Sequence, residues 1–168
     1  MRWVGLVLVV GAAALIGHGL ARERERRVAQ LGALLHSLEA LETEVVYGLT
    51  YLREAFQRIA REYPECRALF RRAARGLEAG ETARTAWKEA LAAYRRSASL
   101  TAEDLLPLER IGGVLGLSAA ADQERHLRLV RRELEARLAE ARGSLPQATR
   151  LYRTLGLFCG LAVALLLL

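Results

Sequence analysis

Apolar and charged positions are segregated along the chain, with uncharged runs at both ends and mixed helical patterning between them. Residues 3–20 contain no Asp, Glu, Lys or Arg. As a helix, these eighteen residues span about 27 Å, close to the roughly 30 Å hydrocarbon core of a bilayer. We therefore predict an N-terminal transmembrane anchor over residues 1–20. The alternative, a secretory signal peptide, is disfavoured because the run is long and because only Arg2 precedes it, whereas four arginines follow it.

The uncharged run at the C-terminal end is shorter. Residues 154–168 span about 22 Å as a helix, and the apolar stretch reaches back to residue 151 if Arg153 extends to the membrane surface. A buried core helix is the alternative, but the four closing leucines leave no polar face. We predict a transmembrane segment over residues 151–168.

Basic residues flank the same side of both runs, with four arginines after the first and three before the second. Arg2 is the basic residue on the other side. Under the positive-inside rule, this asymmetry places the domain between the runs, residues 21–150, in the cytoplasm. The predicted chain thus has two anchors and one cytoplasmic helical domain.

Between the two runs, apolar residues recur every three or four positions, which is the period of an amphipathic helix, and no stretch alternates as a strand does. Helix-forming residues dominate throughout. We predict an all-α fold, a bundle of about six helices flanked by two transmembrane helices. The expected apolar faces consist of Leu31, Leu34, Leu35, Leu38, Leu41 and Val45; Leu52, Ala55, Phe56 and Ile59; Leu69, Phe70, Ala73 and Leu77; Trp87, Leu91 and Tyr94; Leu105, Leu108 and Ile111; and Leu127, Val130, Leu134 and Leu138.

Turn and capping residues predict where these helices begin and end. The first anchor should continue into the first domain helix until Tyr47-Gly48 interrupts it, and Thr50 should cap the next helix. Pro64 suits a first helical turn, and Pro107 should kink its helix or delay its start. Further expected boundary residues are Gly80, Thr82, Thr101 with Asp104 as a capping box, Ser118, Gly143 and Pro146.

The net charge of +6, from 25 basic and 19 acidic residues, raises the question of nucleic-acid binding. The arginines are interleaved with glutamates, as in Arg22-Glu-Arg-Glu-Arg26, which is typical of a solvated helix face. We therefore expect no nucleic-acid partner. The arginines next to the predicted spans fit the anionic headgroups of a membrane.

The sequence contains no motif of a phosphate-binding loop or of a catalytic serine elbow. Glu42 and Glu44 are two positions apart, so on a helix they point in different directions and do not form an acid–base pair. Cys66 and Cys159 form neither a disulfide framework nor a metal motif. We predict a protein without catalytic activity, cofactor or metal.

Residues 41–50, Leu-Glu-Thr-Glu-Val-Val-Tyr-Gly-Leu-Thr, resemble the signature of the stage III sporulation protein AB family. The resemblance covers essentially the whole chain. Weaker similarities to the family occur at Leu115-Gly116, at Gln123 and His126 in a Q-x-x-H spacing, and at Leu155-Gly156. Tyr51 is a departure, because the family usually has proline there. This change should weaken one helix start without altering the fold.

The resemblance implies a helical domain similar to the cytoplasmic domain of the type II secretion inner-membrane F protein. It places the chain in the channel-like complex between mother cell and forespore of endospore-forming bacteria, in the mother-cell membrane around the forespore. The implied partners are a secretion-type ATPase, stage III sporulation protein AA, and other membrane proteins of the same complex. A second copy of the chain is a further candidate partner.

Seven residues are candidates for partner binding: Glu42, Glu44, Tyr47, Gly48, Thr50, Gln123 and His126. For Tyr47 and Gly48 the alternative is a structural role, because a glycine in a turn generally serves the backbone. Two functions remain open. The first is an adaptor that docks the ATPase to the membrane. The second is a membrane-surface regulator whose basic helical domain binds anionic lipid.

Overall fold

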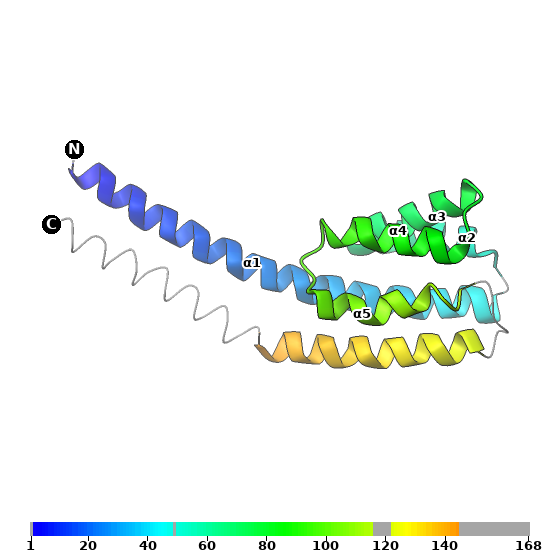
Figure 1. The fold of residues 1–168 in the computed structure, drawn as a ribbon. Helices are drawn as coiled ribbons and strands as arrows, with labels where there is room; N and C mark the ends of the chain where they lie inside the picture. The colour runs from blue at the N-terminus through cyan, green and yellow to red at the C-terminus, as the bar shows by residue number, and fades with distance from the viewer. Residues whose placement is uncertain (1, 49, 116–121, 145–168) are drawn as a thin grey trace. The chain divides into compact units, whose positions relative to one another are not determined.

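The computed structural model describes residues 2–48, 50–115 and 122–144, with side chains from His18 onward except at Val46. Every regular element in these ranges is a helix, and none is a strand. The all-α fold with about six helices is confirmed. The elements are α1 (Arg2–Glu42), a π-helix (Thr43–Tyr47), α2 (Leu52–Glu62), a 3-10 helix (Pro64–Cys66), α3 (Arg67–Glu78), α4 (Ala83–Arg95), α5 (Ala102–Ile111) and a last helix over residues 122–144 (Figure 1).

Within the described part of the chain, no helix is both long enough and apolar enough to cross a membrane. The predicted anchor, residues 1–20, falls on α1, whose side chains before His18 lie outside that description. The predicted span over residues 151–168 lies outside it entirely. Both spans, and the domain limits of 21–150, therefore stay predictions.

The chain divides into two compact units. One comprises residues 27–139 and contains α2 to α5 complete, and the other comprises residues 1–26 and 140–168. In the latter, the side chains of Arg22 to Arg26 are exposed, as predicted for a solvated helix face. The sites described below lie in the unit of residues 27–139, which we call the helical unit.

Two long helices contribute one apolar stripe each to the helical unit. α1 runs from Arg2 to Glu42 without a break, as predicted. The buried positions follow the helical period in both helices, so each buries one face and leaves the other to solvent. The stripes are Leu31, Leu34, Leu38 and Leu41 on α1, and Leu127, Val130, Leu134 and Leu138 on the last helix.

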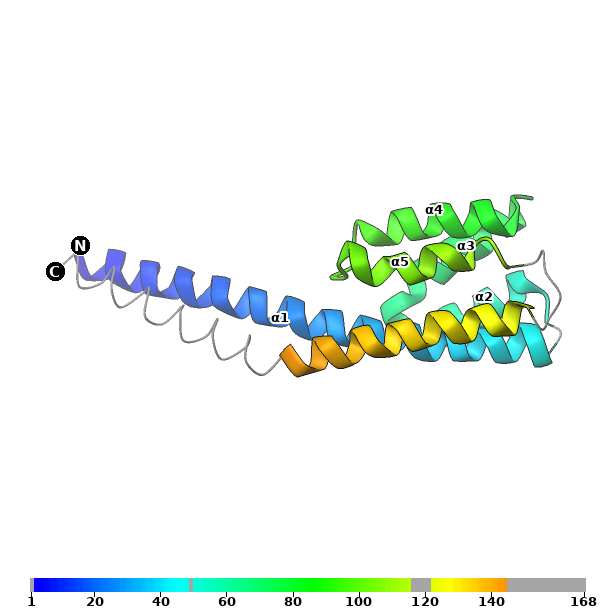
Figure 2. The ribbon, with the colours of Figure 1, turned by 60° about the horizontal axis from the view of Figure 1, so that its bottom comes forward.

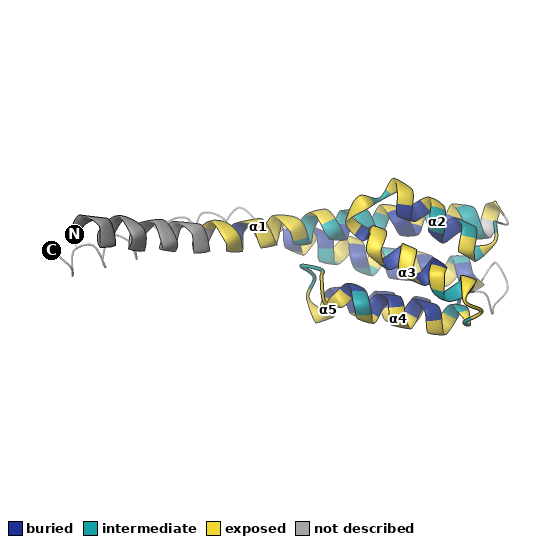
Figure 3. Cartoon of the chain, turned by 90° about the horizontal axis from the view of Figure 1, so that it is seen from above, coloured by how far each residue is buried: buried dark blue, intermediate teal, exposed yellow. Residues whose placement is uncertain are grey.

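Three shorter helices form an aromatic core. α3 packs against both α2 and α4, and their buried faces point toward one another (Figure 3). Phe56, Phe70 and Trp87 come from the three helices, with ring centroids 5.7 to 5.8 Å apart. A Cβ on Gly76 would lie 2.7 Å from the Cβ of Ala86, so the glycine permits α3 and α4 to approach closely.

α5 is fixed at its N-terminus by a buried ion pair. Thr101 and Asp104 form the predicted capping box. The Asp104 carboxylate also accepts two hydrogen bonds from Arg27 of α1, at 2.7 Å from Nε and 2.8 Å from Nη2. Burial by itself raises the pKa of Asp104, but the hydrogen bonds from Arg27 and Thr101 outweigh it and lower the pKa overall.

Several helix boundaries confirm the sequence prediction and others correct it. Gly80 has a φ of +85° just beyond α3, and Thr82 accepts a hydrogen bond from the backbone of Thr85 as the cap of α4. Thr50 is not a cap, because Tyr51 occupies the N-cap position of α2 and the Thr50 hydroxyl bonds elsewhere.

Two residues of types that usually interrupt helices lie inside helices here. Pro107 is buried within α5, which begins at Ala102, so the proline does not delay the start of that helix. The last helix continues through Gly143 to residue 144, so this glycine does not end it. A single glycine costs only about 1 kcal/mol in a helix, which neighbouring residues outweigh. Ser118 and Pro146 lie outside the described residues.

Candidate functional site: the corner at the end of α1

The signature residues form a corner where α1 changes from an α-helix to a π-helix. The backbone N–H of Gly48 donates to the carbonyl of Thr43 at 2.9 Å, a bond that spans five residues rather than four. The N–H of Thr50 then donates to the carbonyl of Glu44, also at 2.9 Å. Short π-helices at the end of α-helices are frequent at functional sites, because the wider turn changes where side chains point.

A glycine is required at position 48 because other atoms of the corner lie close to it, and not because its backbone conformation is unusual. Its φ of −81° and ψ of −12° are accessible to any residue. A Cβ at this position would lie 2.9 Å from the carbonyl oxygen of Glu44 and 3.2 Å from the Thr50 hydroxyl. This close approach supports a backbone role for Gly48, and partner binding by this residue stays a prediction.

We expect Gly48→Ala to lower the free energy of unfolding by about 1–2 kcal/mol, because the corner must shift to accept the methyl group. Thermal unfolding of the full chain in detergent, followed by circular dichroism, measures this loss. Gly32→Ala is the matched control, since a Cβ there meets nothing within 4 Å. Equal stability of Gly48→Ala and wild type would contradict the steric argument.

The two signature glutamates have different partners, as their spacing predicts. Glu44 accepts hydrogen bonds from the Thr50 hydroxyl at 2.7 Å and from Arg58 Nη1 at 3.0 Å. Both bonds stabilise the carboxylate, first the one from Thr50 and then the one from Arg58, and they lower the pKa of Glu44. Glu44 thus joins the corner to α2 of the aromatic core.

Glu42 joins the corner to the last helix. It is only 6% exposed, and its carboxylate lies 2.9 Å from Arg131 Nη1 and 3.8 Å from Arg128 Nε. Arg131 also pairs with Glu39 at 3.1 Å. A carboxylate this deeply buried and paired holds the two arginines in place, and partner binding by Glu42 stays a prediction.

Tyr47 is exposed over 67% of its surface, whereas Glu42 and Gln123 are only 6% and 7% exposed. Its hydroxyl donates to Glu124 Oε1 of the last helix at 2.8 Å. The hydrogen bond and the negative charge of Glu124 raise the pKa of Tyr47, while the bonds from Tyr47 and Arg128 lower the pKa of Glu124. The ring is therefore held at the surface by its hydroxyl.

The last two candidates lie on the last helix and differ from each other. Gln123 is buried, whereas His126 is exposed and its Nδ1 donates to the carbonyl of Asp122 at 2.8 Å. The Q-x-x-H spacing thus combines one buried and one exposed position rather than a pair of ligands. No group of three or more His, Cys, Asp or Glu residues suited to a metal occurs among the described side chains.

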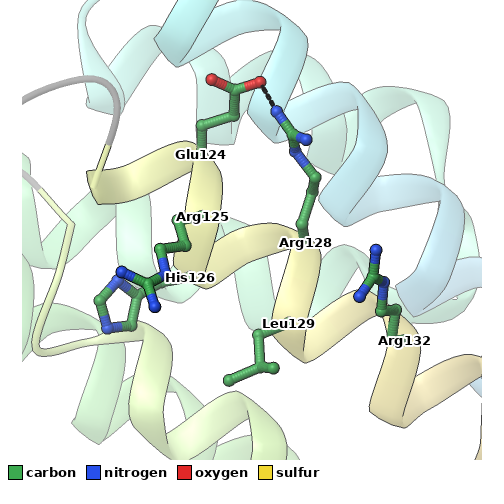
Figure 4. Close-up of a pocket in the computed structure, with 6 residues that line it drawn as sticks. All are labelled: Glu124, Arg125, His126, Arg128, Leu129 and Arg132. Atoms are coloured by element: carbon green, nitrogen blue, oxygen red, sulfur yellow. Dashed lines mark hydrogen bonds and ion pairs between the residues drawn. The ribbon is translucent and has the colours of Figure 1, made fainter.

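A basic hollow of about 600 Å³ opens beside the exposed face of the last helix (Figure 4). Six described side chains line it, and three of them are arginines. Sequence reasoning missed this surface, although the arginines recur at helical spacing. The lining residues are Glu124, Arg125, His126, Arg128, Leu129 and Arg132.

Cys66 is a buried free thiol in the helical unit. Burial raises its pKa to about 11, so at neutral pH the group is a neutral thiol and a poor nucleophile. Cys159 lies outside the described residues. The chemistry of Cys66 is therefore that of a small apolar core residue.

The described residues define the class of protein, an all-α helical bundle. The residues of its sequence signature form a corner that is held by ion pairs. The sequence profile of the stage III sporulation protein AB family matches residues 2–168, and the chain belongs to this family. The resemblance drawn from the signature is confirmed. Stage III sporulation protein AB of Bacillus subtilis (strain 168) is 32% identical over 173 aligned positions, covering 100% of this chain and 99% of that protein.

A solved structure agrees with this assignment. The structure of a stage III sporulation protein AB, SpoIIIAB, superimposes with a TM-score of 0.68 at 31% sequence identity. The match covers 72% of this chain and 97% of the solved chain. The fold of the described helices is therefore shared with a member of the same family.

Proposed function

We propose that this protein is a non-enzymatic membrane component of the secretion-like complex between mother cell and forespore, and that it docks a secretion-type ATPase, stage III sporulation protein AA, to the membrane. Membership of the sporulation family supports the cellular setting. The resemblance to the type II secretion F protein supports the partner. Other membrane proteins of the complex would then contact the same chain.

The observation that carries the docking proposal is the pairing of Tyr47 with Arg128 through Glu124. Both Tyr47 and the Arg128 side chain are exposed, at 67% and 58%, and both bond to the Glu124 carboxylate. Tyrosine and arginine dominate the binding energy of protein interfaces, and side chains already held in place lose less entropy on binding. Leu129, half exposed beside them, adds apolar area.

We expect Tyr47→Ala or Arg128→Ala to weaken ATPase binding by about 10- to 30-fold, the loss typical of an interface hot spot. Titration of the full chain in detergent micelles with the ATPase of the same organism measures the dissociation constant. Arg71→Ala is the control for Arg128→Ala, because Arg71 is an exposed arginine on α3. Tyr47→Phe separates the contribution of the ring from that of the hydrogen bond to Glu124.

Failure of the wild-type chain to bind the ATPase saturably, with its helical content intact, would contradict the docking proposal. Salt-sensitive binding to anionic vesicles in its place would favour the alternative, a membrane-surface regulator with a basic helical domain. Unchanged affinity of both alanine variants would place the docking surface elsewhere on the chain.

The proposed location is the mother-cell membrane around the forespore, with residues 21–150 in the cytoplasm. Two uncharged runs, residues 3–20 and 154–168, and the arginines on their inner sides support it. Extraction of sporulating cells with alkaline carbonate tests insertion, because an integral protein stays in the pellet. Release of the chain into the supernatant would contradict the proposed anchors.

A further inference from the structure

A second surface, away from the signature, has the form of a groove between α4 and α5. Its volume is about 580 Å³, and the two helices lie side by side (Figure 2). On α4 the lining positions follow one helical stripe from Arg84 to Arg95. Three turns of this stripe are about 16 Å long. The opposite wall comes from α5 and from Gly112 and Gly113 at its end.

The floor of the groove is apolar and rigid. Trp87, Leu91 and Leu105 lie beneath it, and the indole Nε1–H of Trp87 donates to the carbonyl of Leu108 at 2.8 Å. A Cβ on Gly112 would lie 3.0 Å from Cδ1 of Trp87. The end of α5 therefore reaches the indole without a side chain between them, and the groove stays open at this point.

The rim of the groove is cationic. Arg84, Lys88 and Arg95 line it from α4, and none of the three has an acidic partner among the described residues. Arg110, on the other wall, is paired with Glu133 of the last helix. Glu109 is the acidic residue among the described lining side chains. An apolar floor between unpaired cations is thus the complement of a negatively charged amphipathic partner.

We propose that this groove binds an acidic amphipathic helix of another protein. The apolar face of such a helix lies over this floor, where Ala92 is the exposed apolar side chain, and its Asp or Glu residues face the α4 cations. A groove three turns long with a fixed floor matches one helix, whereas a lipid surface needs no groove. A second copy of this chain is disfavoured, because a chain of net charge +6 repels its copy.

The test uses the full chain in detergent micelles and a fluorescein-labelled 14-residue helical peptide, with leucines at every third or fourth position and glutamates beside them. We expect saturable binding that weakens as salt rises. A peptide of identical composition in scrambled order should bind at least about 10-fold more weakly, because its leucines no longer share one face. Equal binding of the two peptides would overturn the proposal, since charge alone would explain it.

Charge reversal of the rim locates the site. The triple variant Arg84→Glu, Lys88→Glu and Arg95→Glu should weaken peptide binding by at least about 10-fold. The matched control reverses three exposed arginines on α2 and α3, as Arg53→Glu, Arg61→Glu and Arg71→Glu, for the same change in net charge. Equal losses in both triple variants would overturn the groove as the site.

Two single variants distinguish binding inside the groove from attraction by its charge alone. Ala92 is exposed and lines the groove, so Ala92→Arg adds a cation but obstructs the floor. We expect weaker peptide binding, and stronger binding would overturn the proposal.

Lys88 is the only lysine of the chain, so a carbodiimide should join the peptide to this side chain. Lys88→Arg should remove this cross-link and keep the affinity.

Two further outcomes would overturn the proposal in favour of another occupant. One is binding of anionic phosphatidylglycerol vesicles that the rim reversal abolishes, with no binding of the peptide. The other is a cross-link from Lys88 to an acidic residue of a second copy in the absence of peptide.

Discussion

Replacing Arg27 by leucine should lower the free energy of unfolding by about 3–4 kcal/mol, the cost of leaving a buried charge without its partner. The Asp104 side chain is fully buried, and Arg27 supplies two of its hydrogen bonds. Without them the carboxylate keeps the hydrogen bond that the backbone N–H of Thr101 donates to it in the capping box. Thermal or urea unfolding of the full chain in detergent gives the difference from wild type.

The acid dependence of this loss tests its cause. In the wild type the pKa of Asp104 is below its ordinary value, so its stabilising effect is complete above about pH 4 and is lost as pH falls through the folded-state pKa. In Arg27→Leu, the hydrogen bonds from Arg27 no longer oppose the effect of burial. The pKa of Asp104 is therefore higher in this variant than in the wild type. The stability gap between the variant and wild type should therefore narrow as the pH falls from the pKa of Asp104 in the variant to its lower pKa in the wild type.

Two further variants complete the Arg27 experiment. Arg26→Leu changes the neighbouring arginine, whose side chain is exposed, and should alter stability by less than about 0.5 kcal/mol. Adding Asp104→Asn to Arg27→Leu should recover part of the loss, because an amide carries no charge to leave unpaired. A gap between Arg27→Leu and wild type that does not change with pH would show that lost packing, and not charge, is the cause.

Trp87→Ala should cost about 4–5 kcal/mol, at the upper end for truncation of a buried aromatic residue. The indole contacts two phenylalanine rings, and its N–H bonds to the carbonyl of Leu108. Its removal creates a cavity where α2, α3, α4 and α5 meet. Unfolding of the full chain in detergent, followed by circular dichroism, measures the loss.

A graded series separates the two roles of Trp87. Trp87→Phe keeps most of the ring contact but leaves the Leu108 carbonyl without its donor, so we expect a loss of about 1–2 kcal/mol. Tyr51→Ala is the control, because Tyr51 is 80% exposed and its removal should change stability by less than about 0.5 kcal/mol. A Trp87→Ala loss no larger than that of Tyr51→Ala would exclude the aromatic core as a source of stability.

Apolar periodicity predicted most of the helical unit because each helix buries one stripe, and local spacing is sufficient to identify a stripe. Leu31, Leu34 and Leu38 on α1 are examples. The capping box at Thr101 was equally predictable, since its partners are three residues apart. Thr50 was mistaken for a cap because the π-helix turns its hydroxyl toward Glu44, and a π-helix has no local sequence signal comparable to a cap.

The long-range polar contacts could not be predicted from one sequence. Arg27 and Asp104 are 77 residues apart, and so are Tyr47 and Glu124. Nothing in the local pattern distinguishes Arg27 from Arg26, although one is part of a buried ion pair and the other is exposed. The signature residues were found through the family resemblance, whereas their arginine partners required the fold.

Because of the π-helix, the signature depends on the number of residues in this stretch as well as on their identities. Between Thr43 and Gly48 the backbone contains one residue more than an α-helical turn would hold. Deleting one residue from this stretch would restore the α-helical period and rotate Tyr47 by about 100° relative to α1. Its hydroxyl would then turn away from Glu124. In evolutionary terms, this corner should tolerate substitutions more readily than insertions or deletions.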